Sequence, residues 1–399
     1  MKPAVEAIIE QSVISVAPME GLTTFPMRLW LSIVSQPQSM TTPFLRVTRA
    51  FPEREIPSTF APELYQLRDV LPYTITPQFI SGDPEQFLRA ADMLPPSIAP
   101  ILEINCGCPS PNSLGRLAGS GMLHDAESYG RTIERLSAHL GPGRLAVKMR
   151  LGIDSPEEFP VLLAAIASLP LARLTIHGRT RADGYRGHAR WPLIQRGAED
   201  AQAPVIASGD VLGIESIKTL FREAPSLKGA MIGRGVLRNP WVFTEIRRGH
   251  PTEMSLLTFV NALLCYVLIQ ELWHSHPQKL ITRISSGRIG NPCGTDYGAW
   301  EKLTVELTAI VFGVPFVLNH GFGLPSDAVS PVAFGRLKIL WAYLRSGLPE
   351  SFAKASIVRS KSLGQFFERL LEAGRELEKP TLPITHQAEW DSLFAGARG

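Results

Sequence analysis

The chain has 399 residues, of which 45% are hydrophobic and 19% are charged, with 33 glycines, 33 prolines and a formal net charge of +3. This composition excludes a collagen-like or largely disordered chain, and it allows one large domain followed by a smaller one. The mildly basic balance permits a nucleic-acid partner without requiring one.

The cysteines and the apolar segments predict the cellular compartment of the protein. The cysteines are Cys106, Cys108, Cys265 and Cys293. They are too few in so long a chain for a disulfide framework, so we expect a reduced protein of the cytoplasm. Residues 1–11 form an N-terminal extension without the apolar stretch of a secretory signal. We find no apolar run of the roughly 20 residues that span a bilayer, so no membrane partner is expected.

Residues 12–250 alternate short apolar runs with segments able to form helices, such as 84–93 and 126–140. The candidate strands are 13–17, 43–47, 74–79, 101–105, 145–149, 171–176, 204–207 and 229–232. Regular alternation of strands and helices predicts a parallel sheet. Eight such units in about 250 residues predict an α/β fold of the closed (β/α)8 TIM-barrel type.

The pattern changes in residues 251–399, which predict a smaller all-helical C-terminal domain. The expected long helices are 254–273, 331–346 and 362–378. Between them, residues 276–330 are rich in glycine and proline and have no clean period. Because a structureless stretch of that length is uncommon in a compact domain, we interpret it as an insertion. It either has its own helix at 300–311 or forms a loop.

Polar residues occur at or just beyond the ends of the predicted strands. They are Gln78, Asn105, Cys108, Lys148, His177, Gly209 and Arg234. Active sites of such barrels lie at the carboxyl ends of the strands. One such residue means little, but so many around one rim are hard to explain by packing.

Glycine-containing turns follow the last two predicted strands, as Ser208-Gly209-Asp210 and Gly233-Arg234-Gly235. Glycines there let backbone N–H groups approach a phosphate, which is the common anion site of this fold. Either turn alone is more often an ordinary connection, whereas the pair indicates a phosphate-bearing ligand. Lys148 and His177 could stabilise negative charge on a bound cofactor, although each alone is more often a plain strand-end residue.

Cys108 lies in the segment Asn105-Cys106-Gly107-Cys108-Pro109. The segment only faintly resembles a metal motif, and no further Cys or His pair follows at zinc-ligand spacing, so no metal is expected. A thiol is mostly protonated at neutral pH. Cys108 can therefore donate a proton as a general acid, whereas Cys106 is interpreted as structural.

Residues 331–361 carry a local excess of positive charge, with Glu350 as the single acidic residue. The basic residues are Arg336, Lys338, Arg345, Lys354, Arg359 and Lys361. Trp341 and Tyr343 lie among them, and cations near aromatic rings suit the phosphates and bases of RNA. A solvated helix face with Trp341 in the core explains the same pattern equally well.

Taken in chain order, these motifs resemble those of the tRNA-dihydrouridine synthases. The matching segments are Ala17-Pro18-Met19-Glu20-Gly21, Phe44-Leu45-Arg46-Val47, Asn105-Cys106-Gly107-Cys108-Pro109-Ser110, Val147-Lys148-Met149-Arg150-Leu151-Gly152, His177-Gly178-Arg179-Thr180, Gly184-Tyr185-Arg186, Ser208-Gly209-Asp210 and Met231-Ile232-Gly233-Arg234-Gly235. The Cys-Gly-Cys-Pro-Ser form, with Arg336-Leu337-Lys338 and Tyr343-Leu344-Arg345, is similar to the bacterial subgroup that acts on D-loop position 16.

The resemblance implies an FMN-dependent enzyme that uses NADPH to reduce a D-loop uridine of tRNA to 5,6-dihydrouridine. Hydride would pass from flavin N5 to uridine C6, and Cys108 would give the proton to C5. The implied cofactor-binding residues are Ala17, Pro18, Met19, Gln78, Asn105, Lys148, His177, Ser208, Gly209, Asp210, Gly233 and Arg234. The implied tRNA contacts are Arg46, Arg179, Tyr185, Arg336, Lys338 and Arg345. No stable protein partner is implied, so a monomer is expected.

Two features depart from the family pattern. One is the insertion at 276–330, and the other is Leu114, which stands where many members have an amide residue. Three alternatives stay open: an FMN barrel that acts on a small pyrimidine, a tRNA-binding homologue that has lost catalysis, and a phosphosugar barrel enzyme. Bound flavin and activity without tRNA would separate them.

Overall fold

A computed structural model of the chain describes residues 5–52, 54–110, 118–286, 297–316, 329–354, 356–375 and 381–383. The chain forms two compact units. The first contains Met1–Thr24, Gln38–Val211 and Glu215–Gly233, and the second contains Phe25–Pro37, Leu212–Ile214 and Arg234–Gly399.

Short strands and helices alternate in the first part of the chain, and helices dominate the rest. The strands are β1 (Val13–Val16), β2 (Ser39–Thr41), β3 (Leu45–Arg46), β4 (Thr74–Thr76), β5 (Gln78–Ile80), β6 (Leu102–Cys106), β7 (Leu145–Arg150), β8 (Arg173–His177), β9 (Val205–Ser208), β10 (Gly229–Ile232), β11 (Glu253–Ser255) and β12 (Thr381–Pro383). The helices are α1 (Val5–Gln11), α2 (Phe25–Val34), α3 (Glu55–Ala61), α4 (Pro84–Asp92), α5 (Ala126–Leu140), α6 (Phe159–Ala164), α7 (Trp191–Asp200), α8 (Ile214–Glu223), α9 (Arg234–Arg238), α10 (Val242–Arg248), α11 (Leu256–Ser275), α12 (Pro277–Ser285), α13 (Tyr297–Phe312), α14 (Pro331–Leu344), α15 (Glu350–Lys354) and α16 (Leu363–Arg375).

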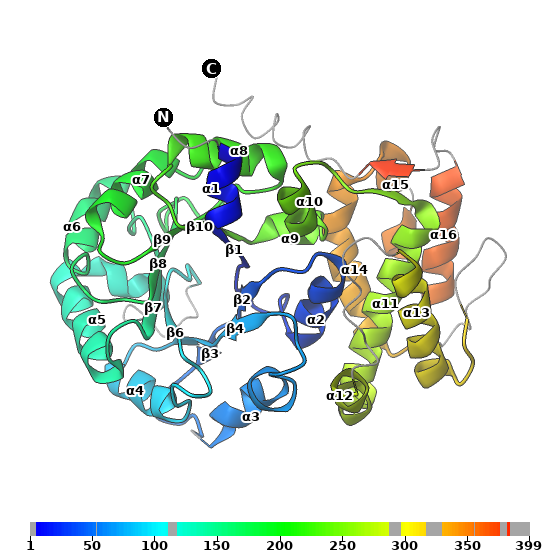
Figure 1. The fold of residues 1–399 in the computed structure, drawn as a ribbon, viewed down its shortest axis with the longest axis horizontal. Coiled ribbons are helices and arrows are strands. Elements are labelled where there is room, and N and C mark those ends of the chain that lie inside the picture. Colours follow the sequence, from blue (N-terminus) through cyan, green and yellow to red (C-terminus); the bar gives the residue numbers. More distant parts are fainter. Residues whose placement is uncertain are drawn as a thin grey trace. The chain divides into compact units, whose positions relative to one another are not determined.

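The parallel strands of the first unit close into a barrel. The sheet has ten strands in the order β3-β5-β6-β7-β8-β9-β10-β1-β2-β4. β2 pairs with β4, and β3 pairs with β5. Along the chain, β3 follows β2 and β5 follows β4. β2 and β3 therefore form one interrupted barrel strand, and β4 and β5 form another. The ten described segments make eight barrel strands, which close on themselves (Figure 1). The predicted (β/α)8 class is confirmed.

The interruption between β4 and β5 occurs at Pro77, which has no N–H to donate to the ladder. On the other side of the break, the Gln78 N–H donates to Thr42 Oγ1 at 3.1 Å instead of to a backbone carbonyl. The Thr42 hydroxyl thus accepts where a backbone carbonyl of the neighbouring strand would in a continuous ladder. The predicted strand 43–47 contains β3, the second half of the neighbouring interrupted strand, whose first half, β2, was not predicted.

The two faces of the barrel strands differ in polarity. On the outer face, Tyr129 of α5 donates its hydroxyl hydrogen to Met149 Sδ at 3.5 Å, so Met149 of β7 points toward the helices. Because side chains alternate along a strand, Lys148 points into the barrel. In the strand register, Asn105 of β6 lies opposite Lys148, and Lys148 lies opposite Thr175 of β8. The interior is therefore polar in the layer that Lys148 occupies.

Helix α11 forms the centre of the second unit. The indole N–H of Trp30 in α2 donates to Ala262 O at 2.9 Å, and the Trp30 and Tyr266 rings meet edge to face with centroids 5.1 Å apart. Within the described residues, α11 is long and apolar enough to cross a membrane, contrary to our expectation that no such segment exists. Most of the helix is buried inside the structure, as expected for the core helix of a folded unit.

The predicted insertion at 276–330 contains two helices, α12 and α13. This confirms the helix expected at 300–311. Leu303 and Leu307 of α13 are buried, and Arg283 of α12 forms an ion pair with Glu306 of α13. Residues 287–296 and 317–328 lie outside the described residues.

The second unit begins before the predicted boundary at residue 250. The Phe243 N–H donates to Ser35 Oγ at 3.0 Å, and Arg247 Nη2 donates to Ser35 O at 2.9 Å. These contacts join α10 to the segment that follows α2. Sequence periodicity could not reveal this grouping, because more than 200 residues separate the partners along the chain.

Candidate active site

The predicted site residues at the ends of neighbouring strands meet at the carboxyl end of the barrel. In the register of β7, β8 and β9, Arg150 lies opposite His177, and His177 lies opposite Ser208. The Gly178 N–H donates to Ser208 O at 3.0 Å and extends this pairing beyond His177. Lys148 precedes Arg150 by two residues on the same face of β7, so it lies one layer deeper than His177.

Lys148 is a half-buried cation with a strongly shifted pKa. Burial lowers the pKa of its ammonium to about 8, the Glu103 carboxylate opposes this shift, and the Arg150 guanidinium adds to it. Most Lys148 side chains are therefore charged at pH 7. A charged group kept inside a protein at such a cost is typical of a functional site, and it favours a ligand with negative charge.

A chain of buried amide and carboxylate groups crosses the barrel interior beside Lys148. Asn105 Nδ2 donates to Gln78 Oε1 at 2.9 Å, and Gln78 Nε2 donates to Glu103 Oε1 at 2.6 Å. Glu103 Oε2 pairs with Arg173 Nη2 at 3.0 Å. Gln78 is 0% exposed, so it lies in the interior of the barrel rather than at the rim where we expected it.

Cys108 occupies a half-buried turn that is held from both sides. Its N–H donates to Asn105 Oδ1 at 2.8 Å, and its carbonyl accepts from Ser120 Oγ at 2.8 Å. Gly119 has φ +57°, and a Cβ at this position would lie 3.0 Å from Cys108 O. Only glycine allows the chain to approach the turn so closely. Residues 111–117, which include Leu114, lie outside the described residues.

Cys106 lies away from the barrel interior. Burial, assisted by the nearby Glu103 carboxylate, raises the pKa of its thiol well above the ordinary value. Its Sγ lies 3.7 Å from Met122 Sδ, and the side chain is 0% exposed. A buried thiol that stays protonated among apolar groups acts as a small packing residue, which agrees with the structural role expected for Cys106.

The two glycine turns differ in the space around them. At Gly209, with φ +111°, a Cβ would lie 2.9 Å from Ala189 Cβ, so only glycine fits there. At Gly233 a Cβ would meet nothing closer than Ala17 Cβ at 3.6 Å and Met19 Sδ at 3.9 Å. Ala17, Met19 and Gly233, three of the implied cofactor-binding residues, are thus neighbours. Arg234 follows Gly233 directly and begins α9.

Arg179 occupies a different place from the one expected for a tRNA contact. It is 0% exposed, and its Nη2 lies 2.8 Å from each carboxylate oxygen of Asp210. Its Nε donates to Arg186 O at 3.0 Å. In this position the guanidinium is out of reach of a macromolecule, and Asp210 Oδ2 also accepts from the Ala189 N–H at 2.6 Å. The pair holds the loop of residues 178–190, defined here as the rim loop, against the end of β9.

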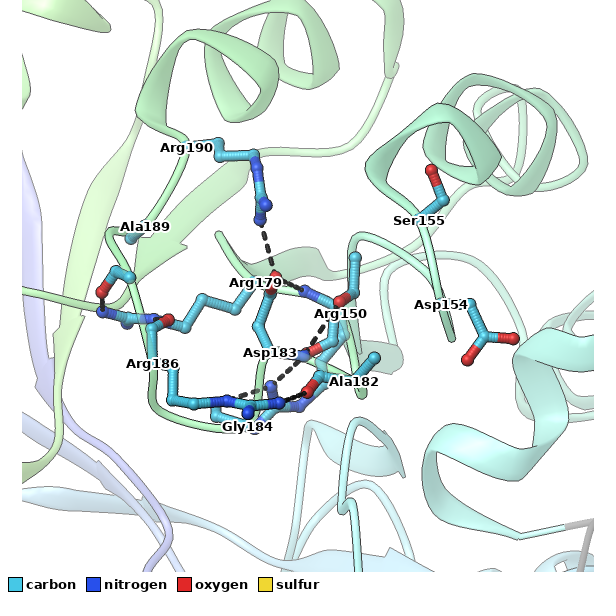
Figure 2. A network of polar contacts seen from close by, with 12 residues as sticks. Arg150, Asp154, Ser155, Arg179, Ala182, Asp183, Gly184, Arg186, Ala189 and Arg190 are labelled. Carbon is cyan, nitrogen blue, oxygen red and sulfur yellow. Dashed lines mark hydrogen bonds and ion pairs between the residues drawn. The ribbon is translucent and has the colours of Figure 1, made fainter. Parts of the chain in front are cut away.

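Arg150 is a second buried arginine of this network, and we did not predict a role for it. Its Nε donates to Gly107 O at 2.8 Å. Its Nη1 donates to Thr180 O at 2.7 Å and to Gly184 O at 3.1 Å, on the loop that Figure 2 shows. One side chain therefore joins the Cys108 turn to the rim loop. The signal in the sequence was a charged residue on the inward face of a buried strand.

Tyr185 lies at the exposed end of the rim loop. It is 60% exposed, and the glycines beside it, Gly184 and Gly187, have φ of +60° and +62°. Farther along the loop, Arg190 Nη1 pairs with Asp183 Oδ2 at 2.7 Å. Burial alone would raise the pKa of Asp183, but the hydrogen bonds from Arg190 and Thr180 lower this pKa to about 2. The loop is therefore anchored at its base and presents an aromatic ring at its tip.

Replacing Arg179 with methionine should lower the free energy of unfolding by about 3–5 kcal/mol, because Asp210 then becomes a buried carboxylate without a counter-ion. Chemical denaturation of both proteins measures this difference. Arg186→Met is the matched control, since Arg186 is exposed on the same loop. Its effect should stay within about 0.5 kcal/mol. Equal effects of the two substitutions would contradict the role given to Arg179.

The remaining donors fit a ligand that carries a phosphate and a ring with hydrogen-bond acceptors, as the predicted FMN does. Arg179 Nη1 is buried without a hydrogen-bond partner among the described residues. It lies 3.6 Å, and His177 Nε2 lies 3.5 Å, from the position of a Cβ on Gly209. Lys148 adds a half-buried positive charge. In the described part of the chain, no group of three or more His, Cys, Asp or Glu residues could hold a metal.

The other predicted tRNA contacts lie in separate elements. Arg46 ends β3 in the first unit, whereas Arg336 and Lys338 lie on α14 in the second. Lys338 Nζ lies 4.6 Å from the centre of the Phe334 ring, and Arg345, just after α14, is exposed. Trp341 is 1% exposed, so this ring belongs to the core and is not available for stacking on a base.

Comparisons with known proteins place the chain in a family. A family model described as dihydrouridine synthase matches residues 15–291. The tRNA-dihydrouridine(16) synthase of Pseudomonas putida is 29% identical over 283 residues, which are 69% of this chain and 85% of that protein. The tRNA-dihydrouridine(16) synthase of Ralstonia nicotianae is 32% identical over 239 residues, or 58% of this chain and 71% of that protein.

Two further proteins are similar over shorter or more divergent stretches. A probable tRNA-dihydrouridine synthase of Rickettsia typhi is 33% identical over 170 residues, 42% of this chain and 51% of that protein. Among solved structures, morphinone reductase aligns with a TM-score of 0.41 at 11% identity, over 60% of this chain and 86% of that one. Because the family model covers well over half of the chain, the protein belongs to the dihydrouridine synthase family.

Proposed function

We propose that the protein reduces a D-loop uridine of tRNA to 5,6-dihydrouridine, with FMN as its cofactor and NADPH as the reductant. One observation carries the proposal: Asn105 lies opposite the half-buried cation Lys148 and also holds the N–H of Cys108. A proton donor and a positive charge thereby lie on the same side of the barrel interior, next to one amide. Reduction of a carbon–carbon double bond beside carbonyl groups needs both.

The described residues divide the work of binding and proton transfer. Ala17, Met19, Gly209 and Gly233 would surround the cofactor, and His177 and Arg179 Nη1 would supply donors to it. FMN, when bound, supplies the hydride that reaches C6 of the uridine. Lys148 offsets the negative charge that develops during reduction, and Cys108 gives its proton to C5. Hydride and proton together add the two hydrogens that convert uridine to dihydrouridine.

The names of two relatives support one target position. The proteins of Pseudomonas putida and Ralstonia nicotianae are both named for position 16. We therefore propose uridine 16 as the target. The cytoplasmic location and the monomeric state stay predictions.

The first experiment is the absorption spectrum of the purified protein, with and without added FMN, followed by mapping of dihydrouridine in tRNA from a deletion strain. We expect a flavin spectrum and the loss of dihydrouridine at one D-loop position. A colourless protein that stays inert with FMN would favour a tRNA-binding protein without catalysis. Reduction of free uracil or orotate in the absence of tRNA would favour an enzyme of small pyrimidines.

Affinity for tRNA should fall steeply with salt concentration, because lysine and arginine contacts to phosphates release bound counter-ions. If Arg345 contacts a phosphate, Arg345→Ala should reduce the slope of log affinity against log salt by about 1. Arg131→Ala is the control, since Arg131 is exposed on α5 and pairs with Glu127. Identical slopes for parent and Arg345→Ala would exclude Arg345 from the tRNA surface.

A further inference from the structure

Glu103 is a fully buried carboxylate that no step of the proposed reaction uses. It is 0% exposed and lies in the barrel interior on β6, two residues before Asn105. One oxygen accepts from Gln78 Nε2 at 2.6 Å, and the other pairs with Arg173 Nη2 at 3.0 Å. A buried charge needs such partners to persist. The structure therefore keeps this carboxylate at some cost, and its contacts indicate what it does.

Glu103 sets the direction in which the amide groups of this chain donate their hydrogen bonds. A carboxylate only accepts hydrogen bonds, whereas each side-chain amide has one donating end and one accepting end. Glu103 therefore obliges Gln78 to turn its nitrogen toward the carboxylate and its oxygen toward Asn105. Asn105 must then turn its nitrogen toward Gln78, which leaves its oxygen to accept from the N–H groups of Gly107 and Cys108 at 3.0 and 2.8 Å.

We propose that Glu103 is a positioning residue that sets the orientation of both amides and thereby holds the Cys108 turn in place. The inference deepens the proposed function, because the turn it holds carries the proposed proton donor. Its effect on the turn itself requires neither flavin nor tRNA.

The fixed orientation of the two amides also determines which hydrogen-bond donors line the barrel interior. Each amide nitrogen has a second hydrogen besides the one used in the chain. With the Lys148 ammonium opposite Asn105, this layer of the barrel is rich in donors. Such a lining suits a ring ligand with carbonyl oxygens, the feature that a pyrimidinedione and an isoalloxazine share.

The substitution Glu103→Gln tests the orientation at nearly constant size. Its new amide faces two donors, Arg173 and Gln78, and can accept from only one of them. Because a charged donor makes the stronger bond, the amide should keep Arg173 and turn its nitrogen toward Gln78. Gln78 and Asn105 must then both turn over, and the Cys108 N–H loses its acceptor.

The double substitution Glu103→Gln with Arg173→Met is the rescue variant. Without Arg173, the new amide is free to turn its oxygen toward Gln78, which restores the original direction of the chain. Replacing a buried ion pair by neutral residues of similar size is often tolerated.

The readout is the rate at which iodoacetamide alkylates Cys108, followed by peptide mass spectrometry in the absence of flavin and tRNA. Loss of the two N–H contacts should speed alkylation of Cys108 by about tenfold in Glu103→Gln, and the double variant should return to within about twofold of the parent. Buried Cys106 is the internal standard for an intact fold and should stay slow in all three proteins.

Three results would overturn the proposal. They are a Glu103→Gln protein that reacts like the parent, a double variant as fast as the single one, and Cys106 reacting as fast as Cys108 in either variant. The last would mean that Glu103 supports the whole fold and not the turn. If the parent binds no FMN, the proposed function fails, while this measurement still decides the role of Glu103. If both hold, kcat for dihydrouridine formation should follow the same order.

Discussion

Cys108→Ala is expected to slow dihydrouridine formation by about 10²–10⁴-fold, which is the typical contribution of a positioned general acid. Binding of FMN should change little, because the backbone of the Cys108 turn is held by Asn105 and Ser120, not by the thiol. Single-turnover measurement with tRNA after reduction of the flavin separates proton transfer from cofactor binding. The rate of flavin reduction by NADPH should stay at the parent value.

Cys265→Ala is the control for this substitution, since Cys265 is a buried thiol of α11 in the second unit. It should leave the rate of uridine reduction unchanged. If Cys108→Ala reduces tRNA as fast as the parent, the proton at C5 comes from another group.

Lys148→Met is expected to weaken FMN binding strongly and to remove its dependence on pH. The pKa of Lys148 is about 8, so its charge, and with it the affinity of the parent for FMN, should decline as pH rises from 7 to 9. A methionine at this position has no charge to lose, so its weak binding should stay flat over that range. Fluorescence titration with FMN at several pH values measures both effects.

The same substitution should stabilise the protein when no ligand is bound. The pKa falls from 10.5 to about 8, a difference of about 2.5 units, which corresponds to roughly 3 kcal/mol. Below pH 8 the lysine is charged in both the folded and the unfolded state, so the full cost of burying the charge is present. Between pH 8 and 10.5 the unfolded state binds more protons, so the stability of the parent rises with pH there.

Denaturation curves of the ligand-free proteins across this pH range test the stability effect. Lys148→Met should exceed the parent in stability at pH 7 and should lack the rise between pH 8 and 10.5. Lys279→Met, at an exposed lysine of α12, is the control and should follow the parent. A Lys148→Met protein that is less stable than the parent at every pH would contradict this. It would show that the lysine side chain stabilises the ligand-free protein by packing.

The barrel was predictable from the sequence because its strands are apolar runs at regular spacing. The two interrupted strands were not, because their continuity depends on pairing between distant residues, such as Thr42 with Gln78. The place of α2 was equally hidden, since it is set by contacts of Trp30 with α11 far along the chain. Periodicity reports which face of an element is buried, but not which partner buries it.

The site was predictable where polar residues follow strand ends, and less so where charges pair inside the barrel. Arg179 looked like a surface contact because nothing in the sequence links it to Asp210. Glu103 was overlooked, although a charged residue two positions before Asn105 in an apolar strand signals a buried polar face. Its partners, Gln78 and Arg173, come from two other strands, so only the closed barrel brings the three together.

Arg150 imposes a constraint on exchanging parts between members of this family. Because its donors are shared between Gly107 on one side and Thr180 and Gly184 on the other, neither segment has a complete set of partners alone. A chimera that imports the rim loop from a relative would need an arginine at the end of β7 to bind it. We therefore expect a loop and a barrel taken from different members to fit together only when that arginine is present.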